Sequence, residues 1–131
     1  YEARLYNADA ILLIASILSL EHISDFIEIA KSMNMNCLVE VNNEEELSKV
    51  LDSKAEIIGI NNRNLDTLEI DLNTTLRITN KTPSDKIIVS ESGINSKDYI
   101  KKIQSKVNAI LVGTYFMQSS NPEKEILSLL K

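Results

Sequence analysis

Polar residues with the chemistry of a binding site follow the apolar run Ile57-Ile58, in the stretch Gly59-Ile60-Asn61-Asn62-Arg63-Asn64-Leu65. A buried parallel strand normally stays apolar along its length, so amides and a guanidinium at its end need a polar partner. Asparagines are also common in ordinary turns, and the Asn pair alone would favour a loop. Arg63 favours a site, because Asn61 and Arg63 together offer a neutral donor and acceptor beside a fixed cation. That combination suits a substrate with hydroxyls and an acid group.

Two carboxylates could carry protons at the same site. Glu40 stands between Val39 and Val41, inside an apolar run. Burying a charged carboxylate is costly, and a group in such a setting suits general acid or base catalysis near neutral pH. The alternative is a structural ion pair between Glu40 and Arg63. Glu91 ends another apolar run and offers a second carboxylate, although a solvated loop acid is an equally good interpretation.

Two glycine-containing segments could bind a phosphate. Ser92-Gly93 and Gly113-Thr114 each follow an apolar run. Glycine lets backbone N–H groups approach an anion, and hydroxyls add donors. In barrel enzymes the phosphate site commonly follows the last two strands, often with a short extra helix, for which residues 115–117 are a candidate. Two ordinary glycine turns are the alternative.

Composition describes an ordinary globular chain of one domain. The 131 residues are 44% apolar and 25% charged, which suffices for a sizeable core. The net charge of -5 argues against nucleic acid and against an anionic membrane surface as partners. Cys37 has no second cysteine to pair with, which favours a reducing cytoplasm, and no apolar run reaches the length of a membrane span. Because the sequence begins at Tyr1 with what reads as the tail of a helix, we expect a piece of a longer protein.

The sequence gives no sign of a metal or cofactor site. It contains one cysteine and one histidine, with no pair at metal-ligand spacing. It also lacks the glycine patterns of dinucleotide-binding and P-loop folds.

Strands and helices alternate along the chain in a pattern that positions these residues. Apolar runs of strand length alternate with segments of helical period, several of them preceded by a capping Ser or Asn. The predicted strands are residues 10–14, 37–41, 57–60, 87–89 and 109–112, and the predicted helices begin after Ser19, Asn43, Ser96 and Asn121, with a further helix around 73–80. This pattern predicts an α/β fold with a parallel sheet, either an open doubly wound sheet or a barrel. In both, functional groups gather at the carboxyl ends of the strands.

Five segments resemble the indole-3-glycerol-phosphate synthase family of tryptophan biosynthesis. They are Leu12-Leu13-Ile14, Leu38-Val39-Glu40-Val41, Ile58-Gly59-Ile60-Asn61-Asn62-Arg63-Asn64-Leu65, Ser90-Glu91-Ser92-Gly93-Ile94 and Leu111-Val112-Gly113. They occur in order along the whole chain, and GINNRNL is the most specific of them.

The resemblance implies a TIM (β/α)8 barrel of which this chain supplies about strands 4 to 8, with residues 1–131 forming the C-terminal portion of a single catalytic domain. It implies a carboxy-lyase that closes the indole ring of 1-(2-carboxyphenylamino)-1-deoxyribulose 5-phosphate, losing carbon dioxide and water, without a cofactor. By the same resemblance the residues take the following roles: Glu40 and Asn61 are catalytic; Arg63, Glu91, Ser92, Leu12 and Leu65 bind substrate, the two leucines as an apolar wall; Gly93, Gly113 and Thr114 bind phosphate.

The chain departs from the family in length. A complete barrel needs about 250 residues, and the resemblance implies that the first three strands, with a glutamate and two lysines of the site, are absent. Two other interpretations therefore stay open: another phosphate-binding barrel enzyme, such as an isomerase or aldolase, and a non-catalytic fragment that folds or assembles. The absence of partner strands also leads us to expect that the isolated chain is inactive and self-associates.

Overall fold

The computed structural model describes residues 1–130, which form one five-stranded parallel sheet. The strand order β1-β2-β3-β4-β5 follows the order of the chain. A doubly wound sheet reverses its strand order at a switch point, so the unbroken order indicates a barrel-type winding. The strands are β1 (Ala10–Ile14), β2 (Asn36–Val41), β3 (Ile57–Asn61), β4 (Ile87–Glu91) and β5 (Ala109–Leu111).

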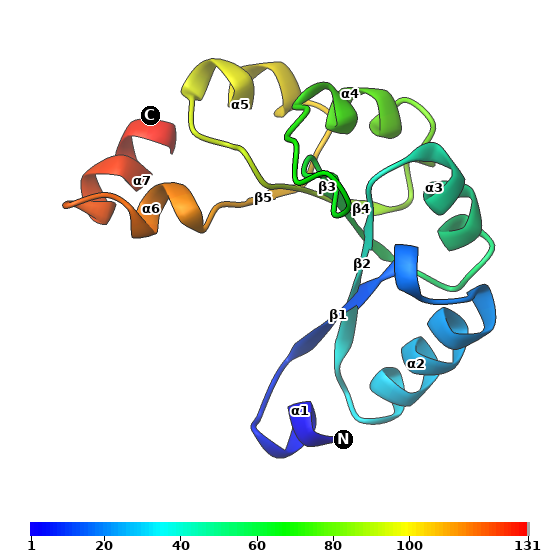
Figure 1. Cartoon of the computed structure of the whole chain (residues 1–131). Coiled ribbons are helices and arrows are strands. Elements are labelled where there is room, and N and C mark those ends of the chain that lie inside the picture. The colour runs from blue at the N-terminus through cyan, green and yellow to red at the C-terminus, as the bar shows by residue number, and fades with distance from the viewer. Residues whose placement is uncertain (131) are drawn as a thin grey trace.

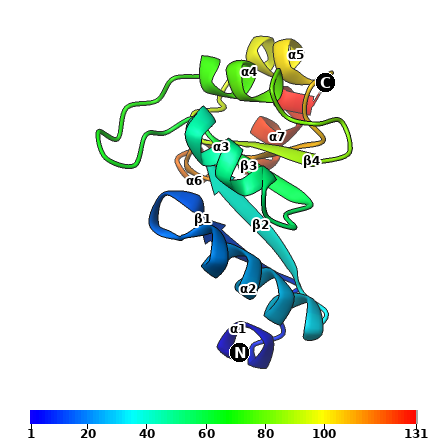
Figure 2. The ribbon, with the colours of Figure 1, turned by 90° about the vertical axis from the view of Figure 1, so that its right-hand side faces the viewer.

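Helices cover only one side of this sheet. Figure 1 shows α2 to α5 following one another around the outer side of an arc of strands, with the chain ends on opposite sides of its opening. The view in Figure 2 shows the same separation of the two ends. No helix in the described part of the chain is long and apolar enough to cross a membrane. The helical elements are α1 (Glu2–Leu5), the 3-10 turn η1 (Ala15–Ile17), α2 (Leu20–Ser32), α3 (Glu44–Leu51), α4 (Asn73–Thr79), α5 (Lys97–Ile103), α6 (Thr114–Met117) and α7 (Pro122–Leu130).

The predicted helix starts are confirmed by their caps. The Ser19 hydroxyl accepts from the His22 backbone N–H at 3.2 Å. At α3 the Asn43 side chain accepts from the Glu46 N–H at 2.9 Å, and its own amide donates to the Glu46 carboxylate at 2.8 Å. The first of these bonds satisfies a backbone donor that the first helical turn leaves free, and the second holds the capping side chain in place. The predicted strands are confirmed too, with ends displaced by no more than a residue or two.

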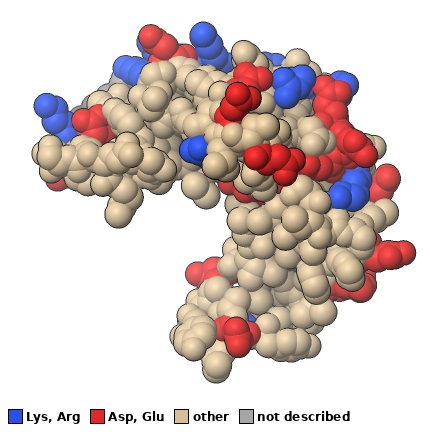
Figure 3. Space-filling view, in the orientation of Figure 1, with Lys and Arg blue, Asp and Glu red and all other residues tan. Residues whose placement is uncertain are grey.

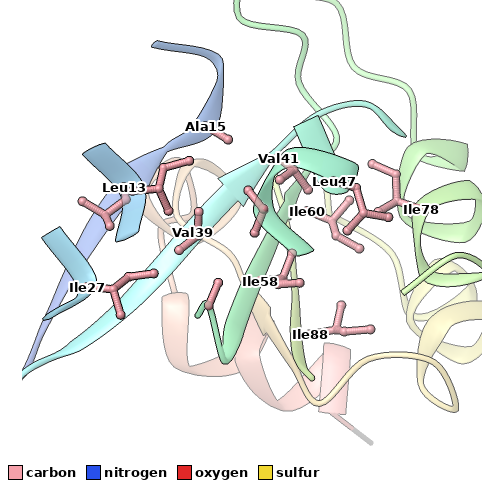
Figure 4. Packing of buried hydrophobic residues seen from close by; sticks show 13 residues of the cluster. Leu13, Ala15, Ile27, Val39, Val41, Leu47, Ile58, Ile60, Ile78 and Ile88 are labelled. Atoms are coloured by element: carbon pink, nitrogen blue, oxygen red, sulfur yellow. The ribbon is translucent and has the colours of Figure 1, made fainter. Parts of the chain in front are cut away.

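The core lies between the sheet and its helices, as Figure 4 shows. Alternate strand residues point toward the helices, because strand side chains alternate between the two faces. The labelled core residues from β1 to β4 are Leu13, Val39, Val41, Ile58, Ile60 and Ile88, and they pack with Ile27, Leu47 and Ile78 from the helices. This alternation leaves Glu40 and Glu91 on the other, concave face.

The concave face carries apolar side chains that no helix covers. Leu12 and Leu111 are each 49% exposed, and Ile87 is 46% exposed. In Figure 3 most of the charged side chains in view lie over the outer side of the arc, and the inner side is largely uncharged. In a closed barrel this face packs against the opposite wall.

Candidate active site

The carboxyl ends of β2, β3 and β4 bring two carboxylates together over a glycine. Glu40 is in register with Gly59, and Asn61 is in register with Glu91. Glu91 leans back over Gly59, where a Cβ atom would collide with its Oε1. Because position 59 has no side chain, the carboxylates of Glu40 and Glu91 can face each other across β3.

Burial changes the protonation of Glu91. The residue is 5% exposed, and its Oε1 has no hydrogen-bond partner among residues 1–130. Removal from water raises the pKa of Glu91 to about 7, with a smaller contribution from the facing Glu40 carboxyl. Glu91 is therefore a buried strand residue and not a solvated loop acid. Near neutral pH Glu91 is therefore present in both its protonated and its charged form, which suits a group that takes part in acid–base chemistry.

Asn61 and Arg63 leave β3 toward this site. Asn61 is buried, and its Oδ1 accepts from the Arg63 backbone N–H at 2.9 Å. The Arg63 guanidinium donates to the Leu68 carbonyl at 3.1 Å. None of the ion pairs within the described residues joins Arg63 to Glu40. The alternative interpretation, a structural ion pair between Glu40 and Arg63, is therefore not what these residues form, and both groups stay available to a ligand.

A pocket of about 340 Å³ opens beside the carboxylates. Residues 92–95 after β4 and 111–115 at the end of β5 line it, together with Arg63. It thus brings together the predicted phosphate residues Gly93, Gly113 and Thr114 with Ser92.

The backbone of the loop after β4 is unusual at two residues. Ser92 and Gly93 have φ of +66° and +73°, and a Cβ at Gly93 would lie 2.5 Å from Ile70 Cγ2. Glycine is required at position 93 by both conformation and space.

Leu65 and Leu12 lie on the other side of the carboxylates from this pocket. Leu65 and Ser16 line a small hollow with Glu40, between the loops that follow β1, β2 and β3. Leu12 lies on β1, in register with Leu38. Leu65 is 43% exposed, so it and Leu12 present uncovered apolar surface near the carboxylates. No group of three possible metal ligands occurs within residues 1–130.

Asn62 is the polar residue whose importance the sequence analysis missed. It is 1% exposed and points to the helix-covered face, where it hydrogen-bonds to Thr75, Ser90, Ser92 and Tyr99. Strand alternation is the sequence signal that could have separated Asn62 from Asn61, because adjacent residues at the end of a strand face opposite sides of the sheet. Asn61 therefore lies on the same face as the two carboxylates, whereas Asn62 forms its hydrogen bonds on the helix-covered face.

Comparison with known proteins decides the family. The family model for indole-3-glycerol phosphate synthase matches residues 1–129. The chain belongs to this family. A relative named indole-3-glycerol phosphate synthase from Endomicrobium trichonymphae is 45% identical over 130 residues, which are 98% of this chain and 50% of the relative. The one from Acetivibrio thermocellus is 46% identical over 96% of this chain and 49% of its own length. The prediction of family is thus confirmed, and a different barrel family is excluded.

Longer relatives and solved structures complete the comparison. The "Tryptophan biosynthesis protein TrpCF" of Buchnera aphidicola is 46% identical over 99% of this chain and 29% of its own length. The chain spans about half the length of the first two relatives. Among solved structures, a 3-hexulose-6-phosphate synthase superposes with a TM-score of 0.80 at 18% identity, covering 98% of this chain and 63% of that one. The predicted fold class is confirmed: five consecutive strands of a TIM barrel with their helices.

Proposed function

We propose that these residues form the carboxyl-terminal part of a single barrel domain that acts as indole-3-glycerol-phosphate synthase. The observation that carries the proposal is the pair of facing carboxyls, Glu40 and Glu91, beside a pocket with glycines in both of its main loops. Family membership supports the reaction, and the relatives' length supports a larger complete domain. We place the protein in the cytoplasm, as expected for a biosynthetic enzyme with an unpaired cysteine.

The proposed substrate is 1-(2-carboxyphenylamino)-1-deoxyribulose 5-phosphate. Its phosphate enters the pocket of Gly93 and Gly113, where backbone N–H groups and the Thr114 hydroxyl donate to it. Arg63 lines the same pocket and supplies a positive charge. The aromatic ring lies against Leu12 and Leu65. The sugar carbonyl and hydroxyls then reach Asn61, Ser92 and the two carboxyls.

The reaction forms one carbon–carbon bond and breaks another. The ring carbon that carries the carboxylate attacks the sugar carbonyl carbon, and the carbonyl oxygen gains a proton. Carbon dioxide leaves that ring carbon and restores aromaticity. The new hydroxyl is then protonated and leaves as water, while the ring system loses a proton. In this dehydration Glu40 is the proton carrier, and Glu91, with its pKa near 7, can exchange a proton with it.

Replacing Glu40 tests this role in the complete protein that carries this chain. Glu40→Gln keeps the shape of the side chain and removes its ability to transfer a proton. We expect kcat to fall by about 10²–10⁴-fold, as is typical when a general acid or base is removed. The KM should change far less, because the phosphate and ring contacts remain. Formation of indole-3-glycerol phosphate, followed by its indole fluorescence, is the measurement.

The matched control is Glu45→Gln, on the exposed side of α3. It changes the net charge equally and should leave kcat unaltered. A Glu40→Gln enzyme with undiminished kcat would remove Glu40 from the mechanism. Equal losses in both variants would point to a general effect of charge.

A further inference from the structure

Asn62 lies beside the proposed site without lining either of its pockets. We propose that Asn62 is a positioning residue that fixes the loop of residues 92–95, which lines the pocket assigned above to the substrate phosphate. The proposal rests on the proposed function for the identity of the ligand. The claim that Asn62 positions the loop rests only on the contacts of Asn62 described below.

The Asn62 amide belongs to a closed ring of buried hydrogen bonds. Its Oδ1 accepts from the Thr75 hydroxyl at 2.9 Å and from the Thr75 backbone N–H at 3.1 Å. Since the Thr75 hydroxyl proton is used in this way, the 2.7 Å contact between Thr75 Oγ1 and Ser90 Oγ has Ser90 as its donor. Ser90 Oγ in turn accepts from Asn62 Nδ2 at 3.4 Å. The donor and the acceptor of each hydrogen bond in this ring are therefore determined, and so is the orientation of the amide.

The remaining contacts of the amide reach the loop. Asn62 Nδ2 donates to the Ser92 carbonyl at 3.1 Å, across from β3 to the end of β4. It also lies 3.4 Å from the Tyr99 hydroxyl, which donates to the Leu72 carbonyl at 2.9 Å. Asn62 thus connects the end of β4 to α4 and α5 through side chains that are almost fully buried.

Ser92 needs such support because of its backbone conformation. Its φ of +66° is unfavourable for a residue with a side chain, and Gly93 follows with φ of +73°. A conformation of this kind persists only where the surroundings impose it. The bond from Asn62 to the Ser92 carbonyl holds the peptide that joins Ser92 to Gly93. That peptide's N–H is the Gly93 donor that the phosphate pocket would use.

Asn62→Ala in the complete protein tests the proposal, with Thr75→Val as matched control. Thr75→Val removes the hydroxyl from this ring at a buried position, but the Thr75 backbone N–H still donates to Asn62 Oδ1, so the amide keeps its orientation and its bond to the Ser92 carbonyl. In Asn62→Ala we expect faster amide hydrogen exchange in residues 92–95. We also expect the inhibition constant of inorganic phosphate and the KM to rise by about tenfold, the cost of one buried hydrogen bond. The kcat should change less, and Thr75→Val should leave loop exchange and phosphate inhibition unaltered.

Equal loop exchange and equal phosphate inhibition in the two variants would overturn the proposal. If Asn62→Ala does not fold, Asn62→Asp has the same shape, retains the oxygen that Thr75 bonds and replaces the amide donor. The same exchange measurement then decides. Faster loop exchange in a protein that inorganic phosphate never inhibits would support Asn62 as a positioning residue, and would refute instead the phosphate assignment of the pocket.

Discussion

The Glu91 carboxyl is buried beside a second carboxyl, so its protonation is coupled to the stability of the fold. Its pKa is raised from 4.5 to about 7. Between these values the folded chain holds a proton that the unfolded chain has released. The contribution of Glu91 to stability is therefore fully present below pH 4.5 and is lost as the pH rises through 7.

Replacing Glu91 with glutamine should remove this dependence on pH. Relative to the parent chain, we expect Glu91→Gln to have an equal free energy of unfolding in acid. Above neutral pH it should be more stable by about 1–3 kcal/mol. Urea unfolding of both chains across this range, at one protein concentration, is the measurement. Parallel curves for parent and variant would show that Glu91 titrates normally, and Glu45→Gln provides the control for a change in net charge.

At the scale of elements, the loop after β5 offers the cleanest test of the phosphate pocket. A Cβ at Gly113 would meet no atom within 4 Å, and the residue has a φ of -112°, which any amino acid adopts. Gly113→Val should therefore fold normally and occupy pocket space. In the complete protein we expect KM and the phosphate inhibition constant to rise about tenfold or more, with a smaller effect on kcat.

The control for this substitution lies at the other end of the barrel. Ser105→Val introduces the same side chain in the turn between α5 and β5, away from the carboxyl ends of the strands. It should leave both constants unaltered. If Gly113→Val binds phosphate as tightly as the parent, the pocket has a different ligand.

Sequence patterns predicted the strands and helices well, because the residues that determine each of them lie within it or directly beside it. Apolar runs set the strands, and a cap such as Asn43 acts within one helical turn. The facing of Glu40 and Glu91 could not be predicted in this way. It depends on the absence of a side chain at Gly59, on a strand that lies between them. Sequence alone also left open whether Glu91 lies in a strand or in a solvated loop, because its burial depends on residues of other strands.

At the scale of the whole molecule, the sheet has two open edges and an uncovered face. β1 and β5 each pair with one neighbour, so each has a row of free backbone groups. Leu12 and Leu111 expose apolar surface beside those edges. We expect the isolated chain of 131 residues to self-associate at micromolar concentration and to form no indole-3-glycerol phosphate.

Sedimentation equilibrium tests the association, with Leu111→Lys as a variant that places a charge on the edge strand β5. The variant should shift the equilibrium toward monomer. A parent chain that stays monomeric with a cooperative melt would contradict the expected association. Measurable turnover by the isolated chain would contradict the need for the lysines that the family resemblance implies.

The agreement between strand order and chain order has a consequence for how the protein is made. Every strand pair in the sheet joins neighbours separated by a single connecting segment, so no pairing waits for a distant part of the sequence. Pairings between nearby segments lose less chain entropy than pairings between distant ones, and they form sooner. The ladder can therefore grow from β1 to β5 as the chain leaves the ribosome. In a complete barrel, the pairing of the last strand with the first spans the whole domain, and ring closure is the step that must wait for the end of synthesis.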